Sequence, residues 1–371
     1  MIPEALIIDM LKRHKIDLCL SLPCISIQQL ILALEQEFKC IALTREEEGV
    51  GIAAGAYLAG HRPIMIIQSG GMGNSLNALL SLTQFYRMPL PMLISWRGIY
   101  KEKLAAQKPM GQHIIGILEG AGIPYVEVHS SGELEKIEDG INKAYKSQTP
   151  VAILLSPAVF EGSPSDLKEE YPPRSRKGKF EHKTNFPEPQ MDRYGAISSI
   201  TDIIKGKLVI SNLGYPSREL YAIRDQPTNF YMLGSFGLAS SIGLGVSLFT
   251  KKDVIIIDGD GSLLANPNVL LSMGRYGPSN LIVIAMDNGT HGSTGDERTG
   301  AYDLFDLELL AKACNITNTA KVVTKDELRD ALKNRDKGTR FIHVIITPGN
   351  KGVGTIPLGP AQIKERFMES I

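Results

Sequence analysis

The chain has 371 residues, which is enough for two domains that each bury a full hydrophobic core. Lysine plus arginine and aspartate plus glutamate number 40 each, so no overall field attracts nucleic acid or an acidic membrane. The four cysteines, at positions 19, 24, 40 and 314, have no paired spacing, which argues against a disulfide framework or a zinc site.

The N-terminal residues 1–17 are amphipathic and lack the apolar core of a signal peptide. No apolar run reaches the roughly 18 residues that a membrane-spanning helix needs. We therefore expect a cytoplasmic protein whose partners include neither nucleic acid nor a membrane.

Short apolar runs alternate with helical patterns along both halves of the chain. Residues 163–189, between the halves, are charged and rich in proline, which predicts an exposed linker. Apolar strands separated by helices predict parallel sheets covered on both faces. We therefore expect an α/β fold with two doubly wound domains, residues 1–162 and 190–371. The predicted strands are 18–22, 40–44, 64–68, 92–96, 151–155, 208–211, 254–258, 281–286 and 341–346.

Two of these strands end in polar residues. Gly259, Asp260, Gly261 and Ser262 follow one strand, and Asn288 closely follows another. Ligands of doubly wound sheets lie beyond the carboxyl ends of the strands. A carboxylate and an amide oxygen suit Mg²⁺ or Ca²⁺ better than zinc, and a glycine-rich helix start favours phosphate. Residues 258–262 alone are equally compatible with a plain strand-to-helix turn, but the second polar strand end favours a binding site.

The sequence GDGS followed at a distance by Asn288 resembles the diphosphate-binding motif of thiamine-diphosphate enzymes. The resemblance implies Mg²⁺ held by Asp260, Asn288 and the backbone carbonyl of Thr290, bridging the two phosphates of thiamine diphosphate. The interval between Asp260 and Asn288 is slightly longer than usual. Asp287 stands where many members carry asparagine, and nothing in the sequence explains this additional negative charge.

The resemblance also implies a carboxylic acid that contacts the cofactor's pyrimidine ring from another domain. Residues 44–60 carry three glutamates before a run of small residues, and the family pattern places the acid at Glu46. Glu47 and Glu48 are then expected to be solvated. The alternative is an acidic first helical turn that only complements the helix dipole. Burial would raise the pKa of Glu46 and suit proton transfer near neutral pH.

Further cofactor contacts follow from the same resemblance. Within the glycine-rich stretch 231–248, it places Phe236 beneath the thiazolium ring and lets the carbonyl of Gly234 accept from the cofactor's amino group. Such a stretch is otherwise a common packing device. Gln68, Asn74 and Asn77 are expected along the cofactor.

The layout of two domains without a middle domain resembles the phosphonopyruvate and sulfopyruvate decarboxylases. Segments 68–82 and 92–98 carry this resemblance, and 21–24, 96–113 and 287–295 look closest to the sulfopyruvate enzymes. In some organisms the latter consist of two polypeptides, and this chain looks like both fused head to tail.

The substrate should be a 2-oxo acid with a second anion. An arginine fork fits a carboxylate or sulfonate, which makes Arg97, after an apolar strand, the first candidate. His291 is a candidate proton relay, and Cys24 a candidate pocket residue. Each could instead be structural: a surface cation, a packed histidine or an inert buried thiol. The other cationic candidates are Arg45, Lys103, Lys108 and His113.

The resemblance implies decarboxylation of 3-sulfopyruvate to sulfoacetaldehyde and CO₂, in coenzyme M synthesis. It also implies a homodimer or homotetramer with active sites at subunit interfaces. The alternatives are a phosphonopyruvate decarboxylase, a carboligase that uses the same cofactor, and a protein that binds the cofactor without turnover.

Overall fold

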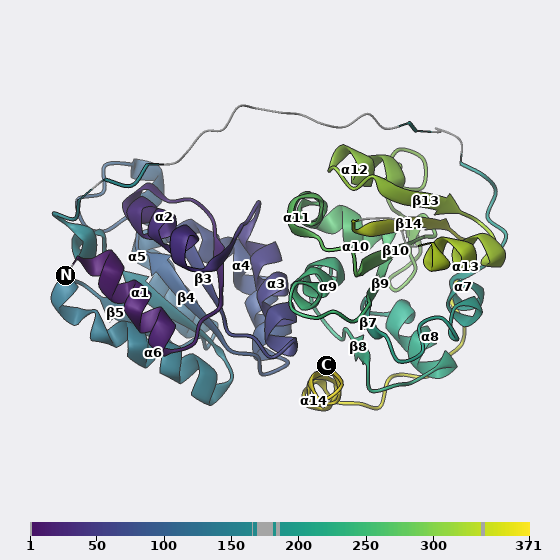
Figure 1. Ribbon diagram of the computed structural model, residues 1–371, viewed down its shortest axis with the longest axis horizontal. Coiled ribbons are helices and arrows are strands. Elements are labelled where there is room, and N and C mark those ends of the chain that lie inside the picture. Colours follow the sequence, from purple (N-terminus) through teal and green to yellow (C-terminus); the bar gives the residue numbers. More distant parts are fainter. Residues whose placement is uncertain (1, 165, 169–180, 183–185, 335–337) are drawn as a thin grey trace. The chain divides into compact units, whose positions relative to one another are not determined.

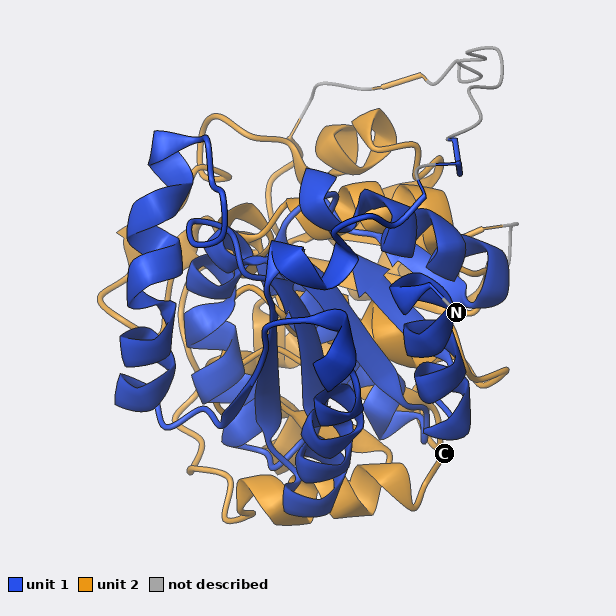
Figure 2. Ribbon diagram, turned by 90° about the vertical axis from the view of Figure 1, so that its left-hand side faces the viewer, with its two compact units in different colours: residues 1–175 blue, residues 176–371 orange. Residues whose placement is uncertain are grey.

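The computed structural model describes residues 2–164, 166–168, 181–182, 186–334 and 338–371. The chain divides into two compact units, Met1–Ser175 (unit 1) and Arg176–Ile371 (unit 2), which Figure 2 distinguishes by colour. This division falls inside the predicted linker, of which residues 165, 169–180 and 183–185 lie outside the described residues. The exact bounds of the linker and of the two domains stay a prediction.

Unit 1 is a six-stranded parallel sheet in the order β2-β1-β3-β4-β6-β5, with helices packed against it (Figure 1). Helices α1, α2 and α6 share one hydrophobic core with the strands, while α3 and α4 pack against each other and against β3 and β4. The strands are β1 (Leu18–Ser21), β2 (Lys39–Ala42), β3 (Pro63–Gln68), β4 (Leu90–Ser95), β5 (Tyr125–Val128) and β6 (Pro150–Leu155). The helices are α1 (Pro3–Arg13), α2 (Gln28–Glu37), α3 (Glu46–Leu58), α4 (Ser69–Ala78), α5 (Lys108–Gly120) and α6 (Glu135–Ser147).

Unit 2 contains a second six-stranded parallel sheet, in the order β13-β14-β10-β9-β7-β8. Its strands are β7 (Leu208–Ser211), β8 (Asn229–Tyr231), β9 (Val254–Gly259), β10 (Leu281–Asp287), β13 (Asn318–Val322) and β14 (Arg340–Ile345). A small hairpin joins β11 (Thr290–His291) to β12 (Glu297–Arg298). The helices are α7 (Arg193–Ser199), α8 (Tyr215–Ile223), α9 (Ala239–Ser247), α10 (Asp260–Ala265), α11 (Asn268–Tyr276), α12 (Leu307–Ala313), α13 (Lys325–Lys333) and α14 (Pro360–Met368).

The two sheets have the same connectivity. Numbered along the chain within each unit, the strands of both sheets follow the spatial order 2-1-3-4-6-5. The order in which strands are added to the sheet reverses between the first and third strands, which in unit 2 are β7 and β9. Loops at such a reversal leave the sheet toward opposite faces and open a crevice beyond the carboxyl ends.

The predicted α/β fold with two doubly wound parallel sheets is confirmed, and each strand predicted from an apolar run is present. Strands β5, β8 and β13 were not predicted, and all three lie at a sheet edge. An edge strand is covered less completely, so β5 and β13 are mostly half-buried and of mixed polarity, and β8 has only three residues. Within the described residues, no helix combines the length and apolar character needed to cross a membrane.

Candidate active site

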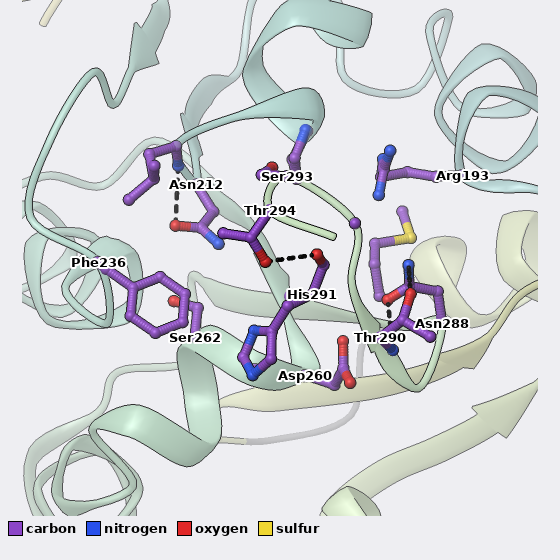
Figure 3. Close-up of a pocket in the computed structure, with 16 residues that line it drawn as sticks. Arg193, Asn212, Phe236, Asp260, Ser262, Asn288, Thr290, His291, Ser293 and Thr294 are labelled. Carbon is purple, nitrogen blue, oxygen red and sulfur yellow. Dashed lines mark hydrogen bonds between the residues drawn. The ribbon is translucent and has the colours of Figure 1, made fainter. Parts of the chain in front are cut away.

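The loops that follow β7, β9 and β10 line one pocket of unit 2 (Figure 3). The cavity has a volume of about 330 Å³, within the range of small-molecule sites. Residues far apart in the chain meet here because the carboxyl ends of parallel strands share one edge of the sheet. The residues predicted from the sequence that line this pocket are Phe236, Gly259, Asp260, Gly261, Ser262, Asn288, Thr290 and His291.

Asp260, Asn288 and Thr290 converge on one part of the pocket wall. In the orientation that satisfies its neighbours, the side-chain nitrogen of Asn288 donates to the Thr290 carbonyl at 2.9 Å and to Asp260 Oδ1 at 3.1 Å. Rotating this amide by 180° would exchange its nitrogen and oxygen. The Asn288 oxygen would then lie 2.9 Å from the Thr290 carbonyl oxygen and 3.1 Å from Asp260 Oδ1. Neighbouring ligands of an octahedral Mg²⁺, bound at about 2.0–2.1 Å, lie about 3 Å apart. The three predicted residues therefore fit a magnesium ion.

The Asp260 carboxylate is buried, and its surroundings favour an added cation. Its Oδ2 accepts a hydrogen bond from the Thr299 hydroxyl, which leaves Oδ1 for Asn288. Burial, and then the charge of nearby Asp287, raises the pKa of Asp260 to about 7. Among the described residues, no cluster of three His, Cys, Asp or Glu side chains could hold a metal. A site with one carboxylate, an amide and a carbonyl suits a hard cation such as Mg²⁺ rather than zinc.

The unexpected Asp287 has a partner within the fold. Its Oδ2 lies 2.7 Å from Nε2 of His343 on β14, and both side chains are buried. Its Oδ1 accepts from the backbone N–H of Gly289 at 3.0 Å, which stabilises the turn that carries Asn288. Although burial alone would lower it, hydrogen bonds to Asp287 and Asp306 raise the pKa of His343. The raised pKa favours the cationic imidazole, whose charge offsets that of Asp287.

His291 and Phe236 form the apolar side of the pocket. Their rings lie 6.0 Å apart, and Phe236 is 45% exposed, so its ring is accessible to a ligand. A Cβ atom at Gly261 would lie 2.6 Å from the His291 ring, so only glycine permits this packing. Gly234, two residues before Phe236, is not among the residues that line the pocket. Its carbonyl contact with a cofactor stays a prediction.

In unit 1, Glu46 is the first residue of α3 and is 3% exposed. Asn74 on α4 donates from its side-chain nitrogen to Glu46 Oε2 at 2.9 Å. A Cβ atom at Gly71 would lie 2.6 Å from Glu46 Oε1, so this glycine permits the close approach of the carboxylate. The structure thus brings Glu46 and Asn74 together, and Gln68 directly precedes α4 at the end of β3.

The expectation that Glu48 is solvated is wrong, because its side chain is fully buried. Its Oε1 accepts hydrogen bonds from the Thr44 backbone N–H at 3.0 Å and from the Thr44 hydroxyl at 3.1 Å. A glutamate at the third position of a helix reaches back to the residues before it, as in a capping box. Glu47 is half-buried and lies 3.5 Å from Arg45, whose side chain is largely exposed.

Arg97 lines a second pocket, in unit 1, together with Lys101, Glu102 and Lys103. Its guanidinium forms a bidentate ion pair with Glu102, with Nε at 2.6 Å and Nη2 at 2.9 Å, and both side chains are buried. The hydrogen bond from Arg97 lowers the pKa of Glu102 to about 2. Glu102, and then the thiol of Cys24, raises the pKa of Arg97. Substrate binding by Arg97 stays a prediction, and a bound anion would compete with Glu102.

The remaining substrate candidates are scattered over unit 1. Lys108 and His113 are exposed on α5, and neither is among the residues that line the two pockets. Their roles also stay predictions. The sequence interpretation missed Glu102, Arg193, Asn212, Thr294 and Thr299. Asn212 directly follows a predicted strand, so the strand-end argument could have found it. Arg193 and Thr299 carry no local signal, because their partners lie far away in the chain. Glu102 and Thr294 have partners close in the chain, but the sequence does not show that the side chains meet them.

Comparisons with known proteins agree with this geometry. The N-terminal TPP binding domain of thiamine pyrophosphate enzymes matches residues 3–115, and the C-terminal TPP binding domain matches residues 215–345. The chain is 45% identical to the sulfopyruvate decarboxylase of Methanosarcina acetivorans, over 100% of this chain and 97% of that protein. It is 31% identical to the phosphonopyruvate decarboxylase of Streptomyces viridochromogenes, over 88% of this chain and 84% of that protein.

In Methanococcus maripaludis the similar enzyme has two subunits. Sulfopyruvate decarboxylase subunit beta is 40% identical over 49% of this chain and 98% of the subunit. Subunit alpha is 39% identical over 39% of this chain and 89% of the subunit. A crystal structure of benzoylformate decarboxylase from Polynucleobacter necessarius has the same fold, with a TM-score of 0.69 at 14% identity, covering 94% of this chain and 99% of that one.

Proposed function

We infer that this chain, which belongs to the sulfopyruvate decarboxylase family of thiamine pyrophosphate enzymes, removes CO₂ from 3-sulfopyruvate and releases sulfoacetaldehyde. The supporting observation is the convergence of three oxygen-bearing groups, of Asp260, Asn288 and Thr290, in a pocket of suitable size. The match extends over the full length of a named relative. By the same proposal, the reaction is a step in coenzyme M synthesis.

Residues of unit 2 would hold the cofactor. Asp260, Asn288 and the Thr290 carbonyl would bind Mg²⁺, and Gly259, Gly261 and the first turn of α10 leave room for phosphate oxygens. Thiamine diphosphate supplies the electron sink that makes loss of CO₂ from a 2-oxo acid feasible. The Phe236 ring would support the cofactor's apolar part, and His291 would donate or accept a proton within the same pocket.

Glu46 would exchange a proton with the cofactor's pyrimidine ring. Its carboxylate is buried, and its hydrogen-bond partner is the neutral Asn74 rather than a cation. A carboxyl group in this position could exchange a proton directly with a ring bound beside it. We propose a homo-oligomer in which Glu46 and the unit 2 pocket act on one cofactor across a subunit interface.

Phosphonopyruvate is the second candidate substrate, because a phosphonopyruvate decarboxylase matches 88% of the chain at 31% identity. The two keto acids share the 2-oxo carboxylate and differ in the anion at carbon 3. An arginine or lysine binds either anion, so the cationic residues of unit 1 do not discriminate between them.

The test measures CO₂ release by the purified full chain with 3-sulfopyruvate, 3-phosphonopyruvate or pyruvate. Each substrate is assayed with both thiamine diphosphate and Mg²⁺, with either one alone, and after treatment with EDTA. We expect turnover of 3-sulfopyruvate only when both are present, at a kcat/KM at least tenfold above that for 3-phosphonopyruvate. A reversed preference would transfer the proposal to phosphonopyruvate. Absence of CO₂ release from every keto acid, with the cofactor bound, would support a binding protein instead.

A further inference from the structure

We propose that Arg193, which no motif of the sequence singles out, is an anion-binding residue of the unit 2 pocket. This inference rests on the proposed function, because it assigns Arg193 to the terminal phosphate of the cofactor. Arg193 is the only lysine or arginine among the described residues that line the pocket. It is the first residue of α7, and it is 6% exposed, so it belongs to the pocket wall rather than to the open surface.

The guanidinium of Arg193 donates its hydrogen bonds from one edge, formed by Nε and Nη2. Its Nε donates to Glu219 Oε2 at 2.9 Å, and its Nη2 donates to Glu219 Oε1 at 3.2 Å. Nη2 also donates to Asn350 Oδ1 at 2.6 Å. Among the described residues, the structure gives Nη1 no hydrogen-bond partner. Arg193 points toward the pocket in Figure 3, so its Nη1 is available to an oxyanion bound there.

The same contacts hold the guanidinium rigidly relative to the predicted metal site. The side-chain nitrogen of Asn350 donates to the Gly292 carbonyl at 2.6 Å, so Asn350 links Arg193 to the chain that follows Thr290. The guanidinium also lies 5.7 Å from the centre of the Tyr215 ring. A donor that is already fixed loses little conformational entropy when its ligand binds, so its hydrogen bond contributes more to affinity.

The charge of the pocket requires a cation beyond the metal. The phosphates of thiamine diphosphate carry about two to three negative charges near neutral pH, by analogy with other phosphate monoesters. Asp260 adds a further negative charge to the wall, and one Mg²⁺ does not offset them all. Glu219 neutralises Arg193 along the Nε–Nη2 edge, and the N–H bonds of Nη1 stay available to a phosphate oxygen. A hydrogen bond from a guanidinium to a phosphate oxygen is charge-assisted and strong.

The experiment compares the binding of two probes to the metal-loaded full chain: pyrophosphate with Mg²⁺, and thiamine diphosphate with Mg²⁺. The variants are Arg193→Lys, the double variant Arg193→Gln with Glu219→Gln, and Glu219→Gln alone. The double variant removes both charges of the buried pair, so it keeps the fold without an unpaired carboxylate. Calorimetry gives the Kd values, and thermal unfolding without ligand reports whether each variant is folded.

We expect both Arg193 variants to bind pyrophosphate and thiamine diphosphate about 10- to 100-fold more weakly, as for loss of a hydrogen bond to a charged group. Glu219→Gln should stay within about threefold of the wild type, because it retains Nη1. Unchanged pyrophosphate affinity in the folded double variant would overturn the proposal. So would an equal loss in Glu219→Gln, which would make the ion pair purely structural.

A kinetic measurement distinguishes whether the anion bound by Arg193 belongs to the cofactor or to the substrate. If Arg193→Lys raises the KM for 3-sulfopyruvate while the Kd for pyrophosphate is unchanged, Arg193 binds the substrate and the assignment to phosphate is wrong. Pyrophosphate binding needs no turnover, so this test also stands apart from the proposed function. A chain that fails to release CO₂ but binds pyrophosphate through Arg193 would contradict the proposed reaction alone.

Discussion

Each unit buries a carboxylate just beyond the carboxyl end of a central strand, and the two carboxylates have opposite pKa shifts. Glu102 follows β4 in unit 1, and the hydrogen bond from Arg97 lowers its pKa to about 2. Asp260 follows β9 in unit 2, and burial raises its pKa to about 7. The first carboxylate has a cation within the fold, whereas we propose that the second receives one from a bound metal ion. The sheets share one connectivity, so the difference arises from the loops that follow the strands.

This difference separates structural from binding carboxylates. A buried ion pair such as Arg97–Glu102 is costly to break but needs no ligand. A buried carboxylate that gains neither a cation nor enough hydrogen bonds costs stability until a ligand offsets that cost. A carboxylate that is buried at such a cost beside an open pocket indicates a binding site.

Glu46 offers the most sensitive test of this distinction, because it is buried beside a neutral partner. Glu46→Gln keeps the size and the hydrogen bond to Asn74 but removes the exchangeable proton. We expect kcat to fall by about 10²–10⁴-fold, the usual contribution of general acid–base catalysis. The Kd for thiamine diphosphate, measured by calorimetry, should change little.

Glu47→Gln is the matched control, since Glu47 lies on the same helical turn and is half-buried. Its kcat should stay close to that of the wild type. If Glu46→Gln released CO₂ at the normal rate, Glu46 would belong with the structural carboxylates such as Glu48.

Asp260→Asn tests the binding carboxylate directly. The variant retains an oxygen at the metal position but loses its charge, so we expect Mg²⁺ affinity to fall more than the roughly 10- to 100-fold seen when only a supporting residue of a metal site is changed. Cofactor-dependent thermal stabilisation should be lost with it, as it should be when EDTA removes the metal from the wild type. Titration with Mg²⁺ in the presence of pyrophosphate measures the effect.

The exposed Asp326 on α13, beyond the pocket lining, provides the control variant Asp326→Asn. Its Mg²⁺ affinity should match that of the wild type. Equal metal affinity in Asp260→Asn and the wild type would mean that the raised pKa of Asp260 marks no metal site.

Glu102→Gln should give the smallest effect on function and a clear effect on stability. The substitution leaves Arg97 buried without its charged partner, which lowers the free energy of unfolding by about 3–5 kcal/mol at pH 7. Because the pKa of Glu102 is lowered in the folded state from 4.5 to about 2, its contribution is present above pH 4.5 and is lost as the pH falls through about 2. As the pH falls over this range, the free energy of unfolding should therefore decrease less in the variant than in the wild type.

Urea unfolding at a series of pH values measures both expectations. Asp202→Asn is the control, because Asp202 also has a pKa of about 2, next to Arg329, but is 64% exposed. Solvent screens an exposed ion pair, so this variant should lose little stability. Equal losses in the two variants would show that burial of the Arg97–Glu102 pair adds nothing.

Some side chains have partners in the fold that the sequence interpretation did not indicate. Arg97 was predicted to bind the substrate, and in the fold its guanidinium forms an ion pair with Glu102. Glu48 was expected in solvent, but it accepts two hydrogen bonds from Thr44, just before its helix. Asp287 was left without an explanation, because His343 lies on a strand 56 residues later. Two of these pairs are close in the chain and one is not, and in each case only the fold shows that the side chains meet.

The order of residues by itself determined the two parallel sheets and the meeting of Asp260 and Asn288 at one sheet edge. Apolar runs of strand length must be buried on both faces, and polar residues at the ends of parallel strands must then share one edge. Only the tertiary structure decided which charges are neutralised within the fold and which remain for a ligand. That distinction depends on distances of about 3 Å between side chains brought together by folding, because charge-assisted hydrogen bonds act only at such range.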